Sequence, residues 1–356
     1  MAPEAAAPPA GEKMAIRVLS RRLVKASDAS IQPHVAAVSN LDLYPNSYQA
    51  SIVCLYPNNG GEFAAVVATF EAVLPSLLNH FYPLAGRIVV DPSTGLPELH
   101  CHNQGAELVV GEVDVALGSL DYAVTNESVK RIMVPYPKDV PLSVQLLRFA
   151  CGSFSVVWGK HNLLHDGQVS TMIVRMWSEL ARTGRISDGL PINHDRSVFR
   201  PRNPPSYGDA LDAMFTTYDD GRLVNALTAH DSFIERLYYI EAGDIARLRD
   251  AASADSEQKL QRASRVQAVS AYLWKALAGT VFASFPLDTD FGFGQATLAM
   301  PIWDHGKVAC GTLAVGVRPR GDGSWLVSAY IWPWMAAALE SDGVLKPLTA
   351  AYLGLV

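Results

Sequence analysis

Three side chains able to move a proton or bind a metal ion fall within six positions, at His161, His165 and Asp166. An apolar run typical of a strand precedes them, and apolar residues at helical spacing follow. A histidine at a strand end can take a proton from a hydroxyl or amine, because imidazole titrates near neutral pH. Asp166 is placed as an N-cap, whose carboxylate accepts free backbone N–H groups. We therefore interpret the stretch as a catalytic site, a metal site or a crowded turn.

Other kinds of chemistry have less support in the sequence. A metal centre needs three or four converging ligands, and His100 and His102, on one face of an expected strand, have no obvious third partner. No two cysteines have CxxC spacing, so we expect reduced thiols, no bound metal and no disulfide. The cysteines are Cys54, Cys101, Cys151 and Cys310. The GxSxG motif of serine hydrolases and the glycine motifs of nucleotide-binding folds are absent.

The composition predicts a soluble globular protein, with 49% hydrophobic and 18% charged residues among 356. The net charge is −6 and no Lys/Arg cluster occurs, so a nucleic-acid partner is not expected. No stretch approaches eighteen uninterrupted apolar residues, which argues against a membrane span. Residues 1–14 are rich in Ala and Pro, and we interpret them as a disordered tail rather than a signal peptide. We expect a cytoplasmic monomer.

Strands and helices alternate irregularly in both halves of the chain, with predicted hairpins at 141–160 and 311–332. Apolar residues at three- and four-residue spacing predict a helix over 61–81, kinked at Pro75. The Pro- and Asn-rich segment 185–215 is interpreted as a linker. The pattern predicts two mixed α/β domains, at 15–184 and 216–356.

Four segments occur in a characteristic order: FYPLAGRI (Phe81–Ile88), HDG after an apolar strand, SAYLWKALA, and DFGFG (Asp290–Gly294). In this combination the chain resembles the BAHD acyltransferases of plants, mainly the hydroxycinnamoyl and benzoyl transferases. The resemblance implies two similar mixed-sheet domains of the chloramphenicol acetyltransferase type, with a channel between them. It also implies transfer of an acyl group from acyl-CoA to an alcohol or amine in secondary metabolism. Acyl-CoA would be a co-substrate, and no bound cofactor is expected.

The family motif HxxxDG supplies a general-base histidine and an aspartate that holds the loop. Carried onto this chain, the resemblance implies His161 or His165 as the base and Asp166 as the ordering residue. The family's DFGWG is thought to be structural, so the corresponding residues here are expected to shape a loop. They are Asp290, Phe291, Gly292, Phe293 and Gly294. No residue is assigned to substrate binding.

The chain departs from the family at two places. Counted back from Asp166, the position of the motif's histidine falls on Asn162, and an amide is no base at neutral pH. On a strand, His161 and Asn162 would point to opposite faces. Moreover, only residues 279–289 separate SAYLWKALA from DFGFG, where the family has a longer segment, so we expect a shortened second domain. The alternative hypothesis is therefore a catalytically impaired protein that binds CoA or aromatic ligands without turnover.

Overall fold

The structure is a computed structural model. It describes residues 14–39, 42, 49–164, 166–187, 192–195, 208–214, 233–254, 262–277, 281–283, 287, 289–303, 311–319 and 321–356. His165, Cys310 and most of the predicted linker lie outside these residues, as does the tail before Met14.

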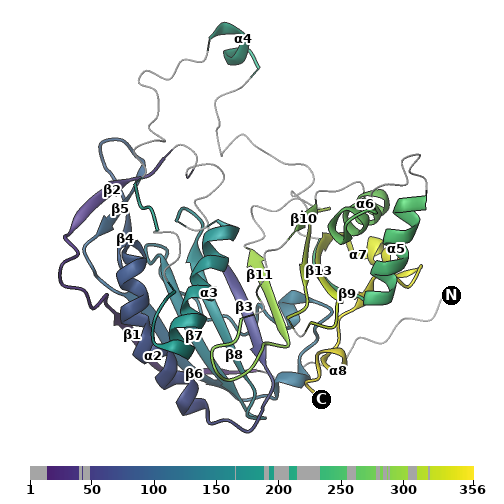
Figure 1. The fold of residues 1–356 in the computed structure, drawn as a ribbon, viewed down its shortest axis with the longest axis horizontal. Coiled ribbons are helices and arrows are strands. Elements are labelled where there is room, and N and C mark those ends of the chain that lie inside the picture. The colour runs from purple at the N-terminus through teal and green to yellow at the C-terminus, as the bar shows by residue number, and fades with distance from the viewer. Residues whose placement is uncertain are drawn as a thin grey trace, which may run out of the picture.

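A six-stranded mixed sheet forms the larger half of the molecule (Figure 1). Neighbouring strands are antiparallel except for β6 and β7, which run parallel. The strand order is β1 (Ile16–Val24), β6 (Ala106–Val113), β7 (Leu142–Phe149), β8 (Phe154–His161), β3 (Gln49–Tyr56) and β11 (Leu298–Trp303). The predicted hairpin at 141–160 is confirmed as β7–β8, which turns at Gly152 with φ of 82°.

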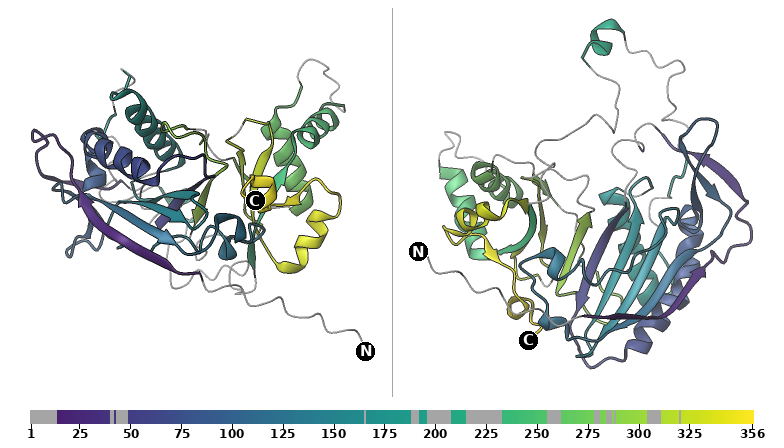
Figure 2. Two further views of the ribbon diagram at one scale, coloured as in Figure 1. Left: turned by 90° about the horizontal axis from the view of Figure 1, so that it is seen from below. Right: turned by 180° about the vertical axis from the view of Figure 1, so that it is seen from behind.

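Two helices, α2 (Phe63–His80) and α3 (Gly167–Thr183), cover one face of this sheet (Figure 2). The apolar stripe predicted for the first helix is confirmed, because Phe70, Leu74 and Leu77 are fully buried in a core shared with the sheet. Pro75 lies inside α2 without ending it. By length and composition alone α2 could cross a membrane, but its buried stripe packs against the sheet.

The opposite face of the large sheet meets the C-terminal half of the chain. Val53 and Val157 share a second core with Leu326 and Leu348, which come from the far half. Three short elements border this junction. They are η2 (Leu117–Ser119), η3 (Thr125–Glu127) and α8 (Ala350–Leu353).

The C-terminal half is built on a five-stranded sheet packed against helices. Its order is β10 (Val281–Ala283), β12 (Leu313–Val317), β13 (Trp325–Ile331), β9 (Ile234–Ile240) and β14 (Lys346–Pro347). Its helices are α5 (Ala242–Ala254), α6 (Arg265–Leu277) and α7 (Pro333–Glu340). The predicted hairpin at 311–332 is confirmed as β12–β13.

The remaining described elements are small. A three-stranded sheet has the order β2 (His34–Ala37), β5 (Pro97–Cys101) and β4 (Arg87–Val90), and η1 (Tyr82–Ala85) precedes β4. One short helix, α4 (Asp209–Asp212), falls within the segment interpreted as a linker. Cys54, Cys101 and Cys151 are free thiols.

The predicted domain boundary needs one correction. The assignment of 216–356 to a single C-terminal domain is wrong for β11, because Leu298–Trp303 pairs with β3 in the first sheet. A strand with a free edge is stabilised by any partner that satisfies its N–H and C=O groups. Here that partner comes from far along the chain, so the C-terminal half contributes one strand to the first sheet.

A buried polar cluster also joins the halves. The carboxylate of Glu235 on β9 is fully buried and lies 3.0 Å from Lys130 Nζ. It accepts hydrogen bonds from the hydroxyls of Thr125 at 2.8 Å and Ser328 at 2.6 Å. Thr125 and Lys130 belong to the first half, so this ion pair fixes the junction from both sides.

Candidate active site

The motif residues occupy a strand–turn–helix. His161 is the last residue of β8 and pairs with Gln49 of β3. Asp166 is the N-cap of α3, as predicted, and its Oδ1 accepts the N–H of Val169 at 2.8 Å. The hydroxyl of Ser170 donates to the backbone carbonyl of Asp166. The residues that carry the motif are therefore held by the end of the sheet and the first turn of the helix.

His161 is buried, with 6% of its surface exposed. Its ring Nδ1 accepts the N–H of Leu163 at 3.2 Å. Burial lowers the pKa of His161 from 6.5 to about 4. The imidazole is therefore neutral at pH 7, and its proton is on Nε2, because a nitrogen that accepts a hydrogen bond carries none.

Asn162 stands where the family motif has its histidine. The side chain is half-buried, and its Oδ1 accepts a hydrogen bond from Lys160 Nζ at 3.3 Å. Burial lowers the pKa of Lys160 from 10.5 to about 8, while the Asp166 carboxylate acts to raise it. The sequence analysis missed Lys160. A lysine near the end of an otherwise apolar strand was the signal that could have found it.

The two faces of β8 follow the predicted alternation. Val156 and Trp158 pack under the helices, and Val157 packs in the core at the junction of the two halves. Gly159 lies against the ring of Tyr136, which leaves no room for a side chain there. His161 shares the face of Val157 and Gly159, the face that meets the C-terminal half.

The DFGFG loop is built around the Asp290 carboxylate. Its Oδ1 accepts the N–H groups of Gly292 at 2.8 Å and Gly294 at 3.0 Å. Both glycines have positive φ, 100° and 95°, which favours glycine at these positions. The carbonyl of Asp290 accepts the Ser178 hydroxyl of α3 at 2.7 Å. Phe291 is 2% exposed and inserts into the aromatic core beside the sheet.

This loop lies at the far end of β8 from His161. Phe293 contacts Phe154, the first residue of β8, with ring centroids 5.3 Å apart. Seven residue steps separate Phe154 from His161, which is roughly 23 Å along a strand. Asp290 is therefore not in contact with reacting atoms near His161.

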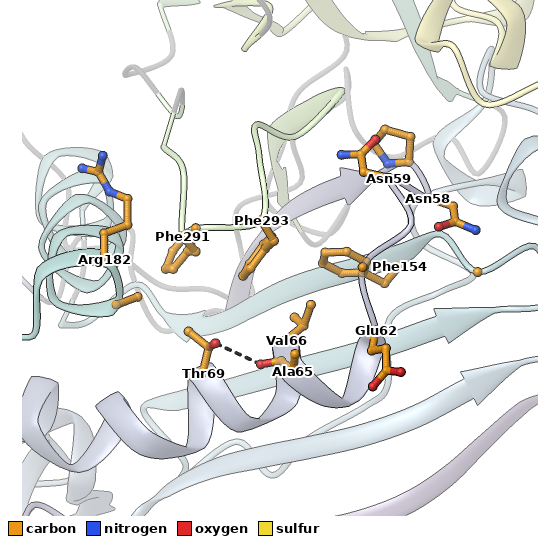
Figure 3. Close-up of a pocket in the computed structure, with 15 residues that line it drawn as sticks. Asn58, Asn59, Glu62, Ala65, Val66, Thr69, Phe154, Arg182, Phe291 and Phe293 are labelled. Carbon is orange, nitrogen blue, oxygen red and sulfur yellow. Dashed lines mark hydrogen bonds between the residues drawn. The ribbon is translucent and has the colours of Figure 1, made fainter.

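A groove of about 550 Å³ lies at the DFGFG end of the sheet (Figure 3). Its walls come from the start of α2, the end of α3 and the loop, and its floor carries three phenylalanine rings. The sequence analysis did not find it, because its walls are far apart in the sequence. Among the described residues, no group of three or more His, Cys, Asp or Glu is arranged to hold a metal ion.

Comparison with known proteins decides the family. The Transferase family, that of the BAHD acyltransferases, matches residues 14–287, which include β8, the turn and α3. The chain belongs to this family.

The similar curated proteins are plant acyltransferases. A hydroxycinnamoyltransferase of Narcissus pseudonarcissus is 36% identical over 47% of this chain and 39% of its own length. Omega-hydroxypalmitate O-feruloyl transferase of Arabidopsis thaliana is 27% identical over 67% of this chain and 53% of its own. Agmatine hydroxycinnamoyltransferase 1 of Oryza sativa subsp. japonica is 27% identical over 94% of this chain and 77% of its own. The chain spans about half the length of the first two relatives.

Solved structures share the fold. Vinorine synthase superposes with a TM-score of 0.70 at 16% identity, covering 94% of this chain and all of that one. F. graminearum TRI101, complexed with coenzyme A and deoxynivalenol, gives a TM-score of 0.67 at 13% identity, covering 87% and 98%. The expected fold, a two-part mixed α/β acyltransferase, is confirmed.

Proposed function

We propose that this protein transfers an acyl group of the hydroxycinnamoyl or benzoyl type from acyl-CoA to an alcohol or amine. The observation that carries the proposal is that the family match spans the strand–turn–helix of His161 to Gly167. The names of the relatives cover both acceptor classes, an omega-hydroxy acid and agmatine. Acyl-CoA is a co-substrate in this proposal, and no resident cofactor takes part.

In the proposed reaction a base at the end of β8 takes the proton of the acceptor O–H or N–H. The acceptor atom attacks the thioester carbonyl, and the electron pair of the C=O bond moves onto oxygen. When the tetrahedral intermediate collapses, the C–S bond breaks, and the CoA thiolate receives the proton from the protonated base. His161 and His165 are the candidate bases, and Asp166 orders the turn without touching substrate.

The surroundings of His161 make slow turnover the expected behaviour. A base with a pKa of about 4 is weak at pH 7. Its Nδ1 lone pair is also engaged by the N–H of Leu163, so accepting a proton there breaks that hydrogen bond. These two facts are the reason to test a second candidate function, a protein of the same family that binds CoA or aromatic ligands without turnover.

One experiment separates the two functions. Purified protein is mixed with 4-coumaroyl-CoA or benzoyl-CoA and a panel of alcohols and amines, and release of the CoA thiol is followed. The shift in melting temperature caused by each acyl-CoA is measured in parallel. Turnover above the rate without protein supports the transferase. A thermal shift without turnover selects the binding protein. If neither turnover nor a thermal shift is observed, both candidate functions are contradicted.

We further propose that the protein acts as a cytoplasmic monomer with no nucleic-acid or membrane partner. The net charge of −6 and the absence of a Lys/Arg cluster support the part of this proposal that concerns nucleic acids. Light scattering coupled to size-exclusion chromatography tests the monomer. A mass of twice 38.5 kDa would contradict it.

A further inference from the structure

The amine of Lys160 lies at the place where the transferase motif lacks its histidine. Lys160 precedes Asn162 by two positions, and its Nζ is 3.3 Å from the Asn162 Oδ1. Because β8 ends at His161, Asn162 belongs to the turn that leads into α3. The long side chain of Lys160 therefore extends beyond the end of its own strand. Its amine contacts the side chain at the position from which a base of this motif would act.

The backbone of Lys160 is held on both sides of the strand. Its cross-strand neighbours are Ala50 of β3 and Leu142 of β7. The hydroxyl of Tyr136 donates a hydrogen bond to the Lys160 carbonyl at 3.0 Å, and its ring lies against Gly159. A group that acts on substrate is most effective when its support fixes its position before the substrate binds. Tyr136 and the two neighbouring strands provide this support for the amine.

The surroundings of this amine favour its neutral form. Lys160 is buried, with 7% of its surface exposed. Burial lowers the pKa of Lys160 from 10.5 to about 8, and the Asp166 carboxylate of α3 opposes that shift. His161 is on the other face of the strand and is neutral at pH 7, whereas His165, in the same turn, lies outside the described residues. Roughly a tenth of the amine is therefore neutral at pH 7, and most of it is neutral at pH 9.

His161 is less well suited to take a proton than this amine. Its Nδ1 accepts the N–H of Leu163 and its Nε2 carries the proton, so neither nitrogen offers a free lone pair. A neutral lysine amine can donate one N–H to Asn162 and still present its own lone pair to an acceptor. We propose that Lys160 is the catalytic base of this chain and acts from beside the motif position that Asn162 occupies. This inference rests on the proposed acyl transfer and names a base that the family motif does not contain.

The proton moves as follows in this step. The neutral Nζ of Lys160 takes the proton of the acceptor O–H or N–H while the acceptor atom forms its bond to the thioester carbonyl carbon. When the tetrahedral intermediate collapses, the C–S bond breaks and the Lys160 ammonium gives the proton to the CoA thiolate. Asn162 orients the amine by accepting one of its N–H groups. The small neutral fraction at pH 7 agrees with the slow turnover expected of the native protein.

The first test is the pH dependence of turnover by the native protein. The donor is 4-coumaroyl-CoA, and the acceptor is an aliphatic alcohol, whose hydroxyl does not titrate between pH 6 and 9. After subtraction of the rate without protein, kcat/KM should rise about tenfold from pH 7 to pH 9, because the neutral fraction of Lys160 rises by that factor. A base with the pKa of His161 would instead give a constant rate above pH 6.

Two substitutions separate the basicity of Lys160 from its charge. Lys160→Met removes the amine and keeps a side chain of similar length, whereas Lys160→Arg keeps a charge that the protein cannot deprotonate. Both should lower the rate at pH 8 by about 10²-fold or more, the usual contribution of a positioned general base. Lys25→Met, at an exposed lysine that follows β1, is the matched control and should leave the rate unchanged. Melting temperatures verify that each variant folds, and the pH profile of the native protein does not depend on them.

The proposal is overturned if the native rate is constant between pH 7 and 9, or if folded Lys160→Met or Lys160→Arg turns over as fast as the native protein. Loss of activity in His161→Gln but not in Lys160→Met would also overturn it, as would a native protein without turnover at pH 9. In that last case, turnover by His161→Asn/Asn162→His would leave the proposed function standing. No turnover by either protein would contradict the transferase function as well, so the two failures are distinguishable.

Discussion

At the scale of single residues, a histidine acts as a general base when a free lone pair faces the acceptor and its pKa lies near the working pH. His161 has a pKa of about 4, and its Nδ1 is bonded to the N–H of Leu163. Asn162 holds the position from which the family's histidine works. It lies beside the Nζ of the buried Lys160 rather than presenting a base. The chemistry of this motif therefore depends on a one-residue difference in sequence.

The buried state of His161 predicts a specific pH dependence of stability. Between pH 6.5 and 4 the unfolded chain binds a proton at this residue and the folded chain does not, so the free energy of unfolding falls as pH falls. The loss amounts to up to about 3 kcal/mol, at roughly 1.4 kcal/mol per pH unit. Urea unfolding at pH 7, 5.5 and 4.5 should show this loss in the native protein and not in His161→Gln. The exposed His102→Gln is the control. Parallel curves for His161→Gln and the native protein would show that the imidazole is not held neutral.

Sequence reasoning could reach part of this site. The position of the motif, the N-cap role of Asp166 and the alternation of Val157 and Trp158 all follow from local spacing. The pKa values of His161 and Lys160 could not be predicted, since they depend on what covers the strand. Nor could the hydrogen bond from Leu163, because it requires the chain to turn back on itself directly after β8.

At the scale of elements, two turns fix the ends of the site-bearing strand. The Asp166 N-cap starts α3 next to the end of β8, and the DFGFG loop ties α3 to the start of β8 through Ser178 and Phe293. Each turn is organised by one carboxylate that accepts backbone N–H groups, one N–H at Asp166 and two at Asp290. Their roles can be separated by substitutions that keep or remove the acceptor oxygen.

Asp166→Ala should lower the free energy of unfolding by about 1 kcal/mol, the usual cost of losing an N-cap. Asp166→Asn keeps a side-chain oxygen for the N–H of Val169 and should restore most of that loss. Chemical denaturation of the three proteins measures the difference. An Asn variant as unstable as the Ala variant would indicate that the charge of Asp166, rather than its capping bond, stabilises the turn.

Asp290→Ala should reduce stability by about 2 kcal/mol, because two hydrogen bonds to Gly292 and Gly294 are lost. Turnover per folded molecule should change little, since the loop lies far along β8 from His161. Asp290→Asn, which retains Oδ1, is the control. A normally stable Asp290→Ala protein with abolished activity would contradict the structural role proposed for the loop.

Local signals also predicted several elements. The hairpin β7–β8 is confirmed. The start of α6 is likewise fixed by neighbours in the sequence, because Ser264 and Gln267 exchange hydrogen bonds in a capping box. Sequence reasoning failed at β11, because its pairing with β3 joins residues more than 240 positions apart and no local pattern encodes it. The groove escaped prediction for the same reason, since Glu62, Arg182 and Phe293 converge only in the folded chain.

At the scale of the whole molecule, the two halves are joined by strand β11, which the C-terminal half contributes to the first sheet, and by the Glu235 cluster. The shortened segment expected between SAYLWKALA and DFGFG lies in the C-terminal half and remains a prediction. The agmatine hydroxycinnamoyltransferase match covers 94% of this chain but 77% of that protein. The site at the end of β8 faces the C-terminal half, so its geometry depends on the stability of the junction between the two halves.

The Glu235 cluster should be among the most sensitive points of the junction. Glu235→Leu leaves the Lys130 ammonium without this buried carboxylate, so the free energy of unfolding should fall by about 3–5 kcal/mol. Adding Lys130→Met to Glu235→Leu should recover much of the loss, because the ammonium that has lost the Glu235 carboxylate is then removed as well. Urea denaturation of the two single variants and the double variant forms the cycle. Additive losses would show that the pair does not couple the halves.

The most direct measurement of the central claim is the initial rate of CoA release by the native protein and by the double variant His161→Asn/Asn162→His. The double variant restores the family order at the end of β8. Hydroxycinnamoyl-CoA or benzoyl-CoA serves as donor, with mixed alcohol and amine acceptors. We expect slow turnover in the native protein and a gain of about 10²–10⁴-fold in the double variant, the usual contribution of a positioned general base. No acyl transfer by either protein would contradict the claim. So would a fast native enzyme that loses nothing in His161→Ala and His165→Ala.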